Sequence, residues 1–415
     1  MPKNPLYTPT QKAIEDKAMA LLARPEMERI KTIIAMLFRN AVAWPSREQM
    51  DRFDSMIDEY LFFHAIRAAN GDANYPVAAR FMVPKHHWFG RDVPGSRWGG
   101  DSPDFVYRNI PIRHGGKYEI RGTTPGGRPH SVNYSLMGDN TASPVTQTIL
   151  DSLDMDLAPD GSFTITIDDT PAEGRRNHLQ TKPGADFIMV RDALGDWLSE
   201  APNAIEVVRL DPDGDPRNED AMAAHLAKIA MDGVYYTIYC FYSGSGEPPN
   251  TVRAPLSSGA FGGMPSQWGT KGNIDLAPGQ AIVVRSNAAG ATFRNLVLTD
   301  PFHISIEYWR RTSSLNMVQM APDEDGDFTY VIAHEDPGIH NWLDTGGVRR
   351  CMFGQRWQAF DRSEKHDDPW MTAKLVAFDD LDKHLPDGVR RVDAAGRKAQ
   401  CDLRQAGVDR RFVEE

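Results

Sequence analysis

The feature that most limits how this chain can fold is a long series of short, alternating segments between residues 75 and 360. The segments are rich in β-branched and aromatic residues, which is typical of β-strands with one buried face. They lie at residues 117–122, 163–168, 186–192, 204–210, 280–286, 292–298, 302–310 and 328–335. Tight-turn sequences with glycine or proline occur between them, at residues 125–129, 159–163 and 323–328. The sequence therefore predicts a mainly β (α+β) fold with two β-sandwich-like or jelly-roll-like units.

Helical patterns precede and interrupt this series. Residues 11–70 carry apolar side chains at helical spacing, and we expect Ser46 to cap a helix with Gln49 three residues later. A second helical pattern covers residues 218–232, with Gly233 as its expected end. The expected divisions are an N-terminal helical segment (1–74), a first β unit (75–215), a linking helix (216–234), a second β unit (235–362) and a polar C-terminal tail (363–415). We expect the tail to be either a partner-docking arm or poorly ordered.

Composition narrows the classes of function. The 415 residues carry a formal net charge of −11, which argues against a broad basic surface for nucleic acid or anionic lipid. Three cysteines without C-x-x-C spacing support neither a disulfide framework nor a structural zinc site, and they fit a reducing compartment. No apolar signal segment, membrane-spanning run or phosphate-binding glycine motif is visible. We therefore expect a cytoplasmic protein with a small-molecule substrate, no nucleic-acid or membrane partner, and homo-oligomerisation as an option.

Five blocks of the sequence are similar to a known family. They are DSPDFVYRNIPIRHGGKYEIRG (101–122), NHLQTKPGADFIMVRDALGDW (177–197), PPNTVRAPLSSGAFGGMPSQWG (248–269), the block 307–347 with SLNMVQ and DPGIHNWLDT, and GQRW (354–357). In this order they resemble the bacterial family of unknown function catalogued as DUF1214, over residues 50–360. The resemblance implies a mostly β architecture with helical additions and a place in catabolic gene sets, and it implies no specific chemistry. The chain departs from the family pattern at Glu307, where aspartate is expected, and it carries His334 and His340 beside the DPGI turn.

The stretch HEDPGIHNWLDTGG, at residues 334–347, raises the question of an active site. Asp344, Thr345 and Gly346 spell the aspartic-protease signature, but such a protease needs two aspartates that share one proton. The apolar strands that flank the signature in such enzymes are missing here. The other interpretation is a turn in which the Asp344 side chain accepts backbone N–H groups.

Carboxylate, arginine and amide side chains lie just before and within this stretch. On a strand, Glu307, Trp309 and Arg311 would share one face by the period of two. We expect Glu307 and Asp344 to perform acid/base chemistry, and Arg311 or Arg356 to hold an anionic group. The other expected substrate-binding residues are Asn316, Asn341, Trp342 and Tyr107. The same side chains could instead form a buried polar network that ties loops to the sandwich.

Histidine and acidic residues raise the separate question of a metal ion. Four such residues lie close together in the sequence: His334, Glu335, Asp336 and His340. Pro337 and Gly338 between them exclude the helical spacing of H-E-x-x-H sites, so the side chains need not converge. The adjacent His86 and His87 would point to opposite sides of an extended chain. We therefore expect no cofactor, with a metal ion at His334, Glu335 and His340 as the alternative.

Together these observations predict a cofactor-independent hydrolase or lyase. It would act on a ring-containing or acidic small metabolite of a catabolic pathway, by carboxylate acid/base chemistry. Nine tryptophans, several of them beside glycine and arginine, favour either a flat wall for a ring-shaped ligand or core filling between sheets. Two other classes stay open. One is a non-catalytic carbohydrate-binding or metabolite-binding β-sandwich protein, which exposed tryptophans would suit, and the other is an assembly protein that docks through its charged tail.

Overall fold

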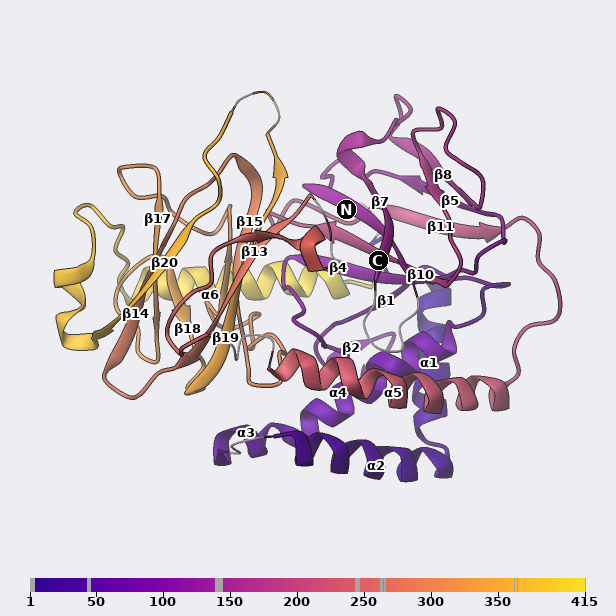
Figure 1. Cartoon of the computed structure of the whole chain (residues 1–415), viewed down its shortest axis with the longest axis horizontal. Helices are drawn as coiled ribbons and strands as arrows, with labels where there is room; N and C mark the ends of the chain where they lie inside the picture. Colours follow the sequence, from indigo (N-terminus) through magenta and orange to yellow (C-terminus); the bar gives the residue numbers. More distant parts are fainter. Residues whose placement is uncertain are drawn as a thin grey trace.

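The computed structural model describes residues 4–414 apart from residues 43–45, 139–144, 243–246, 262–263, 265, 362 and 364. In this described part, twenty strands form five sheets, and the fold is mainly β with an α+β arrangement, as the sequence predicts. Figure 1 shows two β units side by side, with the N-terminal helices and the linking helix along one edge of them. No helix among the described residues is long and apolar enough to cross a lipid bilayer.

The N-terminal part is helical, as its apolar spacing predicts. It forms α1 (Pro9–Leu22), α2 (Pro25–Ala41), α3 (Arg47–Asp51) and α4 (Phe53–Ala69). Ser46 caps α3 as expected, because its Oγ accepts the backbone N–H of Gln49 at 3.1 Å. Helix α4 is buried on nearly all sides, and its first residue, Phe53, packs against Phe302 of the second β unit. The start of α4 thereby lies against loops of the second unit.

The first β unit is a sandwich of two sheets, with strand orders β1-β4-β10-β6-β7 and β11-β5-β8-β9. Its strands are β1 (Ala79–Phe81), β4 (Phe105–Pro111), β5 (Tyr118–Thr123), β6 (Ser131–Gly138), β7 (Thr146–Asp151), β8 (Ser162–Asp168), β9 (His178–Gln180), β10 (Ala185–Ala193) and β11 (Ala204–Arg209). A two-stranded ribbon of β2 (His86–Trp88) and β3 (Arg91–Val93) lies beside it. Alternating side chains such as Tyr134, Ile165 and Ile188 fill the core between the two sheets.

The second β unit repeats this arrangement, with strand orders β12-β13-β19-β15-β16 and β18-β17-β14-β20. Its strands are β12 (Leu256–Ser257), β13 (Trp268–Asp275), β14 (Gln280–Ser286), β15 (Ala291–Thr299), β16 (Ser314–Asn316), β17 (Phe328–Ala333), β18 (Trp342–Asp344), β19 (Arg350–Phe360) and β20 (Met371–Ala377). Leu296, Ile332 and Phe353 belong to its core. The outer faces of the two units meet where Phe105 of β4 stacks on Phe293 of β15, with ring centroids 5.4 Å apart.

The linking helix exists but is longer than predicted. Helix α5 (Glu219–Phe241) begins at the Asn218 cap and continues eight residues past Gly233, the expected end. Gly233 lies inside the helix, where a Cβ atom would come within 2.8 Å of the Tyr60 hydroxyl. The glycine therefore allows α5 to approach α4 closely, and it does not end the helix.

Residues 302–310 do not form the predicted strand. A single bridge joins Ser305 to Thr299, and the backbone N–H groups of Arg310 and Arg311 both donate to the Glu307 carbonyl in a turn. The turn chemistry starts earlier, because the Asp300 carboxylate accepts the N–H groups that follow Pro301. Glu307 and Arg311 are therefore neighbours through a turn and not through the alternation of a strand.

The C-terminal segment is part of the folded core, and the prediction of a docking arm or a poorly ordered tail is wrong. Strand β20 pairs with β14 along its whole length, and η3 (Phe378–His384), α6 (Ala394–Asp409) and η4 (Arg410–Phe412) follow. Figure 1 shows α6 running across the middle of the molecule toward the first β unit. The buried Arg404 of α6 donates to the carbonyls of Tyr308 and Ser314, both at 2.8 Å. Its charge made this segment look like surface, but carbonyl oxygens satisfy the guanidinium inside the protein.

Candidate functional site

Three of the predicted site residues lie together, and their contacts separate their roles. Arg311 Nε donates to Glu307 Oε2 at 3.0 Å, and Arg311 Nη1 donates to Asp344 Oδ2 at 2.9 Å. The other Asp344 oxygen accepts the N–H of Gly346 at 2.7 Å. Both Asp344 oxygens thus have donors, and the side chain is 9% exposed. Asp344 holds the 344–347 turn to Arg311, which fits the turn interpretation better than catalysis, and Arg311 is occupied by two carboxylates of its own chain.

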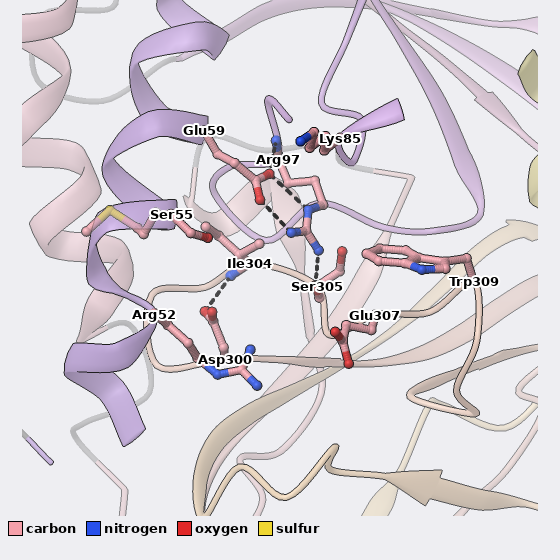
Figure 2. A pocket seen from close by; sticks show the side chains of 11 residues that line it. Arg52, Ser55, Glu59, Lys85, Arg97, Asp300, Ile304, Ser305, Glu307 and Trp309 are labelled. Carbon is pink, nitrogen blue, oxygen red and sulfur yellow. Dashed lines mark hydrogen bonds and ion pairs between the residues drawn. The ribbon is translucent and has the colours of Figure 1, made fainter. Parts of the chain in front are cut away.

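Glu307 also lines a pocket that we call the α4 pocket, shown in Figure 2. The pocket has a volume of about 290 Å³ and lies between the start of α4, residues 85–97 and the loop after β15. Its lining residues are Arg52, Ser55, Met56, Glu59, Lys85, Arg97, Asp300, Ile304, Ser305, Glu307 and Trp309. The pocket thus combines carboxyl groups, basic groups and one indole ring. Asp344 is not part of it.

Asp300 is the carboxyl group with the most perturbed environment in the α4 pocket. Its Oδ1 accepts the backbone N–H groups of Phe302 at 2.9 Å and Ile304 at 3.1 Å. Burial raises the pKa of Asp300 to about 6, although the Arg52 guanidinium and these two N–H groups act in the opposite direction. Asp300 therefore exchanges its proton near neutral pH, which is the property of a general acid or base.

The pKa of Glu307 moves the other way. Burial raises it, but the hydrogen bonds from Arg311 and Arg310 outweigh burial, and the net pKa lies below the ordinary value for glutamate. Glu307 is thus ionised under conditions in which Asp300 still carries its proton. Two carboxyl groups with opposite pKa shifts in one pocket are the usual arrangement for an acid paired with a base.

Two basic side chains of the α4 pocket are available to a ligand. Among the described residues, Arg52 and Lys85 have neither a carboxylate partner within 4.0 Å nor a side-chain hydrogen bond. Arg97, by contrast, is committed: it donates to both oxygens of Glu59 and to the Ser305 carbonyl at 2.7 Å. Figure 2 shows Arg52 next to Asp300, while Arg97 bridges Glu59 and Ser305.

The indole of Trp309 and a neighbouring hollow complete the surroundings. The Arg97 guanidinium lies 5.4 Å from the Trp309 ring centroid, which fixes the ring as one wall of the pocket. A more open hollow of about 570 Å³ shares Arg52 and Glu307 with the α4 pocket. These two residues therefore stand between the pocket and the outer surface.

The predicted amide residues are structural ties. Asn316 Nδ2 donates to Asp104 Oδ1 at 2.7 Å and to the Gly195 carbonyl at 2.9 Å, which joins the second β unit to the first. Asn341 donates to the Ala321 carbonyl at 2.7 Å and accepts the N–H of the same residue at 2.8 Å. Both side chains are buried, so for them the buried-network interpretation fits the structure and substrate binding does not.

The tryptophans do not supply the expected exposed faces. Trp342 is buried, donates to the Ala333 carbonyl at 3.1 Å, and lies under the Arg397 guanidinium. It is therefore not a wall of the α4 pocket. None of the tryptophans in the described part of the chain is among the exposed residues. These tryptophans thus do not provide the exposed ring faces that a carbohydrate-binding sandwich would use.

Tyr107 and Arg356 lie in a different place from Glu307. The Tyr107 hydroxyl accepts the N–H of Ser102 at 3.1 Å, and Arg356 Nη2 donates to the Gly100 carbonyl at 3.0 Å. Both side chains belong to the region where the outer faces of the two β units meet, and neither lines the α4 pocket.

The histidines near the DPGI turn are also tied to neighbours. The two ring nitrogens of His334 lie 2.6 Å from Thr345 Oγ1 and 2.8 Å from the Leu276 carbonyl. His340 Nε2 lies 3.1 Å from the Gln319 carbonyl, and Glu335 is exposed. Within the described residues, no three histidine, cysteine or acidic side chains are grouped so that they could hold a metal ion.

Sequence reasoning missed Asp300, Arg52 and Lys85. Asp300 had a usable signal, because an Asp-Pro pair directly after a strand favours a turn in which the aspartate accepts backbone N–H groups. Arg52 and Lys85 had no such signal in the sequence. They come close to the loop after β15 only because α4 and residue 85 pack against the second β unit.

The fold and the α4 pocket define a class: a protein of two β units with a pocket between a helix and the second unit, in which two carboxyl groups have pKa values shifted in opposite directions. In fold, the chain is similar to an uncharacterised protein from Burkholderia cenocepacia, with a TM-score of 0.73 and 20% sequence identity, over 87% of this chain and 99% of that chain. A protein from Vibrio parahaemolyticus overlaps 77% of this chain and 99% of its own at 11% identity, but its TM-score of 0.41 carries no argument. No family model and no curated protein matches the chain. The likeness to the Burkholderia protein shows a shared fold alone.

Proposed function

We propose that this protein is a cofactor-independent hydrolase or lyase that acts on a small, acidic, ring-containing metabolite in the α4 pocket. The observation that supports this best is the pair of carboxyl groups with opposite pKa shifts, Asp300 and Glu307. We also propose, on the five sequence blocks alone, that the chain is a DUF1214 protein with a catabolic role. That family adds no chemistry, so the reaction has to be argued from the pocket.

In the proposed reaction, Glu307 is the base and Asp300 is the acid. In hydrolysis, the Glu307 carboxylate takes a proton from the attacking water while Asp300 gives its proton to the leaving oxygen. In elimination of water, Glu307 takes a proton from the carbon beside the substrate carboxylate, and Asp300 protonates the departing hydroxyl group. Each turnover leaves Glu307 protonated and Asp300 ionised, and exchange with solvent restores both.

The substrate class follows from the other residues of the pocket. Arg52 and Lys85, which have no carboxylate or side-chain hydrogen-bond partner among the described residues, would bind a carboxylate of the substrate. The Trp309 indole offers a flat apolar surface for one ring. A volume of about 290 Å³ is at the lower end for ligand pockets, which favours a small metabolite over a polymer.

The test is a turnover screen with matched variants. Lactones that carry a carboxylate report hydrolysis by acid release, and cyclic β-hydroxy acids report elimination by the absorbance of the new double bond. Asp300→Asn and Glu307→Gln should each lower turnover by about 100- to 10,000-fold, because each removes one proton-transfer group. Asp323→Asn is the matched control, since burial also raises the pKa of Asp323 but this residue lies outside the pocket.

Two results would contradict the proposal. One is that Asp300→Asn and Glu307→Gln turn the substrate over as fast as Asp323→Asn does. The other is that no compound of the panel is turned over and none raises the melting temperature, which would mean that the α4 pocket does not take acidic ring compounds.

A further inference from the structure

Three basic side chains point away from the cores of the two β units toward the region where these units meet. The strand neighbours of Arg191 in β10 face the core of the first unit, so Arg191 lies on the outer face, directly opposite Tyr107 of β4. In the same way, Arg356 of β19 lies on the outer face of the second unit. Lys271 of β13 pairs with Gly354 and is therefore the diagonal neighbour of Arg356 on that face.

A short segment of the first unit connects the two faces. Arg356 Nη2 donates to the Gly100 carbonyl at 3.0 Å, and the Ser102 N–H donates to the Tyr107 hydroxyl at 3.1 Å. Arg356 and Tyr107 thus hold the same three-residue segment, 100–102. Because Arg191 pairs directly with Tyr107, the basic groups from both units gather at one place, and we call Arg191, Lys271 and Arg356 the junction cluster.

Helix α5 and the loop after β15 close this place from another side. His303 Nδ1 lies 3.2 Å from the Cys240 carbonyl at the end of α5, and the Gly100 N–H donates to the His303 carbonyl at 2.7 Å. Burial, together with the positive charges of Lys271 and Arg356, lowers the pKa of His303 to about 3, so this ring stays neutral. The histidine therefore adds no charge to the junction cluster.

The positive charge of the junction cluster is not balanced by the protein. Among the described residues, none of its three members has a carboxylate partner within 4.0 Å. Arg191 donates to Ser135 Oγ at 2.8 Å and Arg356 to the Gly100 carbonyl, which are neutral acceptors, and each arginine has five N–H donors. The Lys271 side chain makes no hydrogen bond to any described residue. Most of the donors are thus unused, and the side chains remain open to solvent because Lys271 is exposed and both arginines are half-buried.

The pKa values of Lys271 and Arg191 reflect how close the positive charges of the junction cluster lie to one another. Burial lowers the pKa of Lys271, and the neighbouring Arg356 and Arg253 lower it further. Burial also lowers the pKa of Arg191, with Arg356 acting in the same direction. Lys271 is thus surrounded by protein atoms although solvent still reaches it. Groups that are partly desolvated and repel one another would be stabilised by a bound anion.

We propose that the junction cluster binds a small polyanion, a polycarboxylate or a phosphate compound with two or more negative charges. Two guanidinium groups offer paired N–H donors to carboxylate or phosphate oxygens, and Lys271 adds a point charge. Three cations suit an anion with several charges better than a single carboxylate. This site is separate from the α4 pocket, since none of its members lines that pocket, and it goes beyond the proposed function.

The test is calorimetric titration of the full chain with citrate, pyrophosphate and acetate at constant ionic strength. Citrate represents the polycarboxylates, pyrophosphate represents the phosphates, and acetate tests whether one charge is enough. The decisive variant is Lys271→Gln, which removes one charge without breaking an internal hydrogen bond, and Lys271→Arg keeps the charge. Lys85→Gln is the matched control, because it removes an unpaired lysine from the α4 pocket instead.

The expected result is binding of citrate or pyrophosphate to the wild type, with the tighter of the two giving the ligand class. Lys271→Gln should weaken it by about tenfold, as for one lost charged contact, while Lys271→Arg and Lys85→Gln stay within about threefold. Without ligand, Lys271→Gln should melt at or above the wild-type temperature, because a repulsion is removed. The proposal is overturned if neither anion binds the wild type with a Kd below about 1 mM. It is also overturned if Lys271→Gln binds as tightly as the wild type, or if Lys85→Gln loses as much affinity as Lys271→Gln.

Discussion

Replacing Asp300 by asparagine should make the protein more stable at neutral pH while it removes the proposed acid. Asparagine keeps an oxygen that accepts the N–H groups of Phe302 and Ile304, and it cannot ionise. The side chain is buried at 6% exposure, so ionisation of the native aspartate takes place with little help from solvent. The gain from Asp300→Asn therefore depends on pH.

The sign and size follow from the pKa of Asp300, which is raised from 3.8 to about 6. Because the folded protein holds the proton more tightly than the unfolded chain, the contribution of this group is complete below pH 3.8. It is lost as the pH rises through 6. A tenfold change in proton affinity corresponds to about 1.4 kcal/mol, so the loss approaches about 3 kcal/mol at pH 7.5. Asp300→Asn should recover about 2–3 kcal/mol there and only about 0.6 kcal/mol at pH 4.

Urea unfolding followed by tryptophan fluorescence at pH 4, 5.5 and 7.5 measures this directly. Glu307→Gln is the control of opposite sign: the pKa of Glu307 is lowered, so this group stabilises the fold above its ordinary pKa, and the variant should lose stability at neutral pH. A gain from Asp300→Asn that is the same at all three pH values, or a loss at pH 7.5, would refute the raised pKa of the buried Asp300 carboxyl group.

Three further predictions follow from the same contacts. Turnover of any substrate of the α4 pocket should fall above pH 6, because Asp300 must carry its proton. A pH profile of kcat measures this, and a rate that keeps rising to pH 8 would contradict it. Arg311→Met should cost about 2 kcal/mol in urea unfolding, since it leaves the buried Asp344 carboxylate without its cation, and an unchanged midpoint would contradict this. Gly233→Ala should destabilise the protein by about 1–3 kcal/mol, because the new Cβ would lie within 2.8 Å of the Tyr60 hydroxyl. This loss should outweigh the better helix propensity of alanine, and a higher melting temperature would contradict it.

Most of the fold could be predicted because strands and helices have different periods in sequence. Seven of the eight expected strand segments match strands of the structure, since alternation alone reports a face buried in a sandwich. The eighth, residues 302–310, has the same alternation, but Asp300 and Pro301 impose a turn that outweighs it. The sequence predicts too early an end for α5. Glycine ends a helix when it has positive φ, whereas Gly233 lies inside α5 and allows close packing on α4.

The C-terminal segment shows where composition misleads. Its charged residues suggested a solvated tail, but Arg404 and Arg411 are buried and donate to backbone carbonyls between the two units. From sequence alone, a charged residue is expected at the surface, because charged side chains are rarely buried without partners. The backbone carbonyls that bind Arg404 and Arg411 lie far away along the chain, so the sequence gives no sign of them. The division of the chain at residue 362 therefore left out β20, which pairs with β14.

The candidate site was predicted in part. The sequence brought attention to Glu307, Arg311 and Asp344, and the structure places them in one network. Their roles could not be assigned from spacing, because whether an oxygen is free depends on donors such as the Gly346 N–H. The raised pKa of Asp300 could not be identified from the sequence, since it comes from burial, and burial in a loop leaves no periodic signal.

The proposed chemistry depends on the opposite pKa shifts of Asp300 and Glu307 in one pocket. Carbon-13 NMR titration of the side-chain carboxyl groups, with Asp300→Asn and Glu307→Gln to assign the two signals, measures both pKa values without a substrate. We expect Asp300 to titrate at about 6 and Glu307 below its ordinary value of 4.5. If Asp300 titrates at or below 3.8, or if Glu307 titrates above Asp300, the assignment of acid and base is wrong and the α4 pocket loses its proposed chemistry.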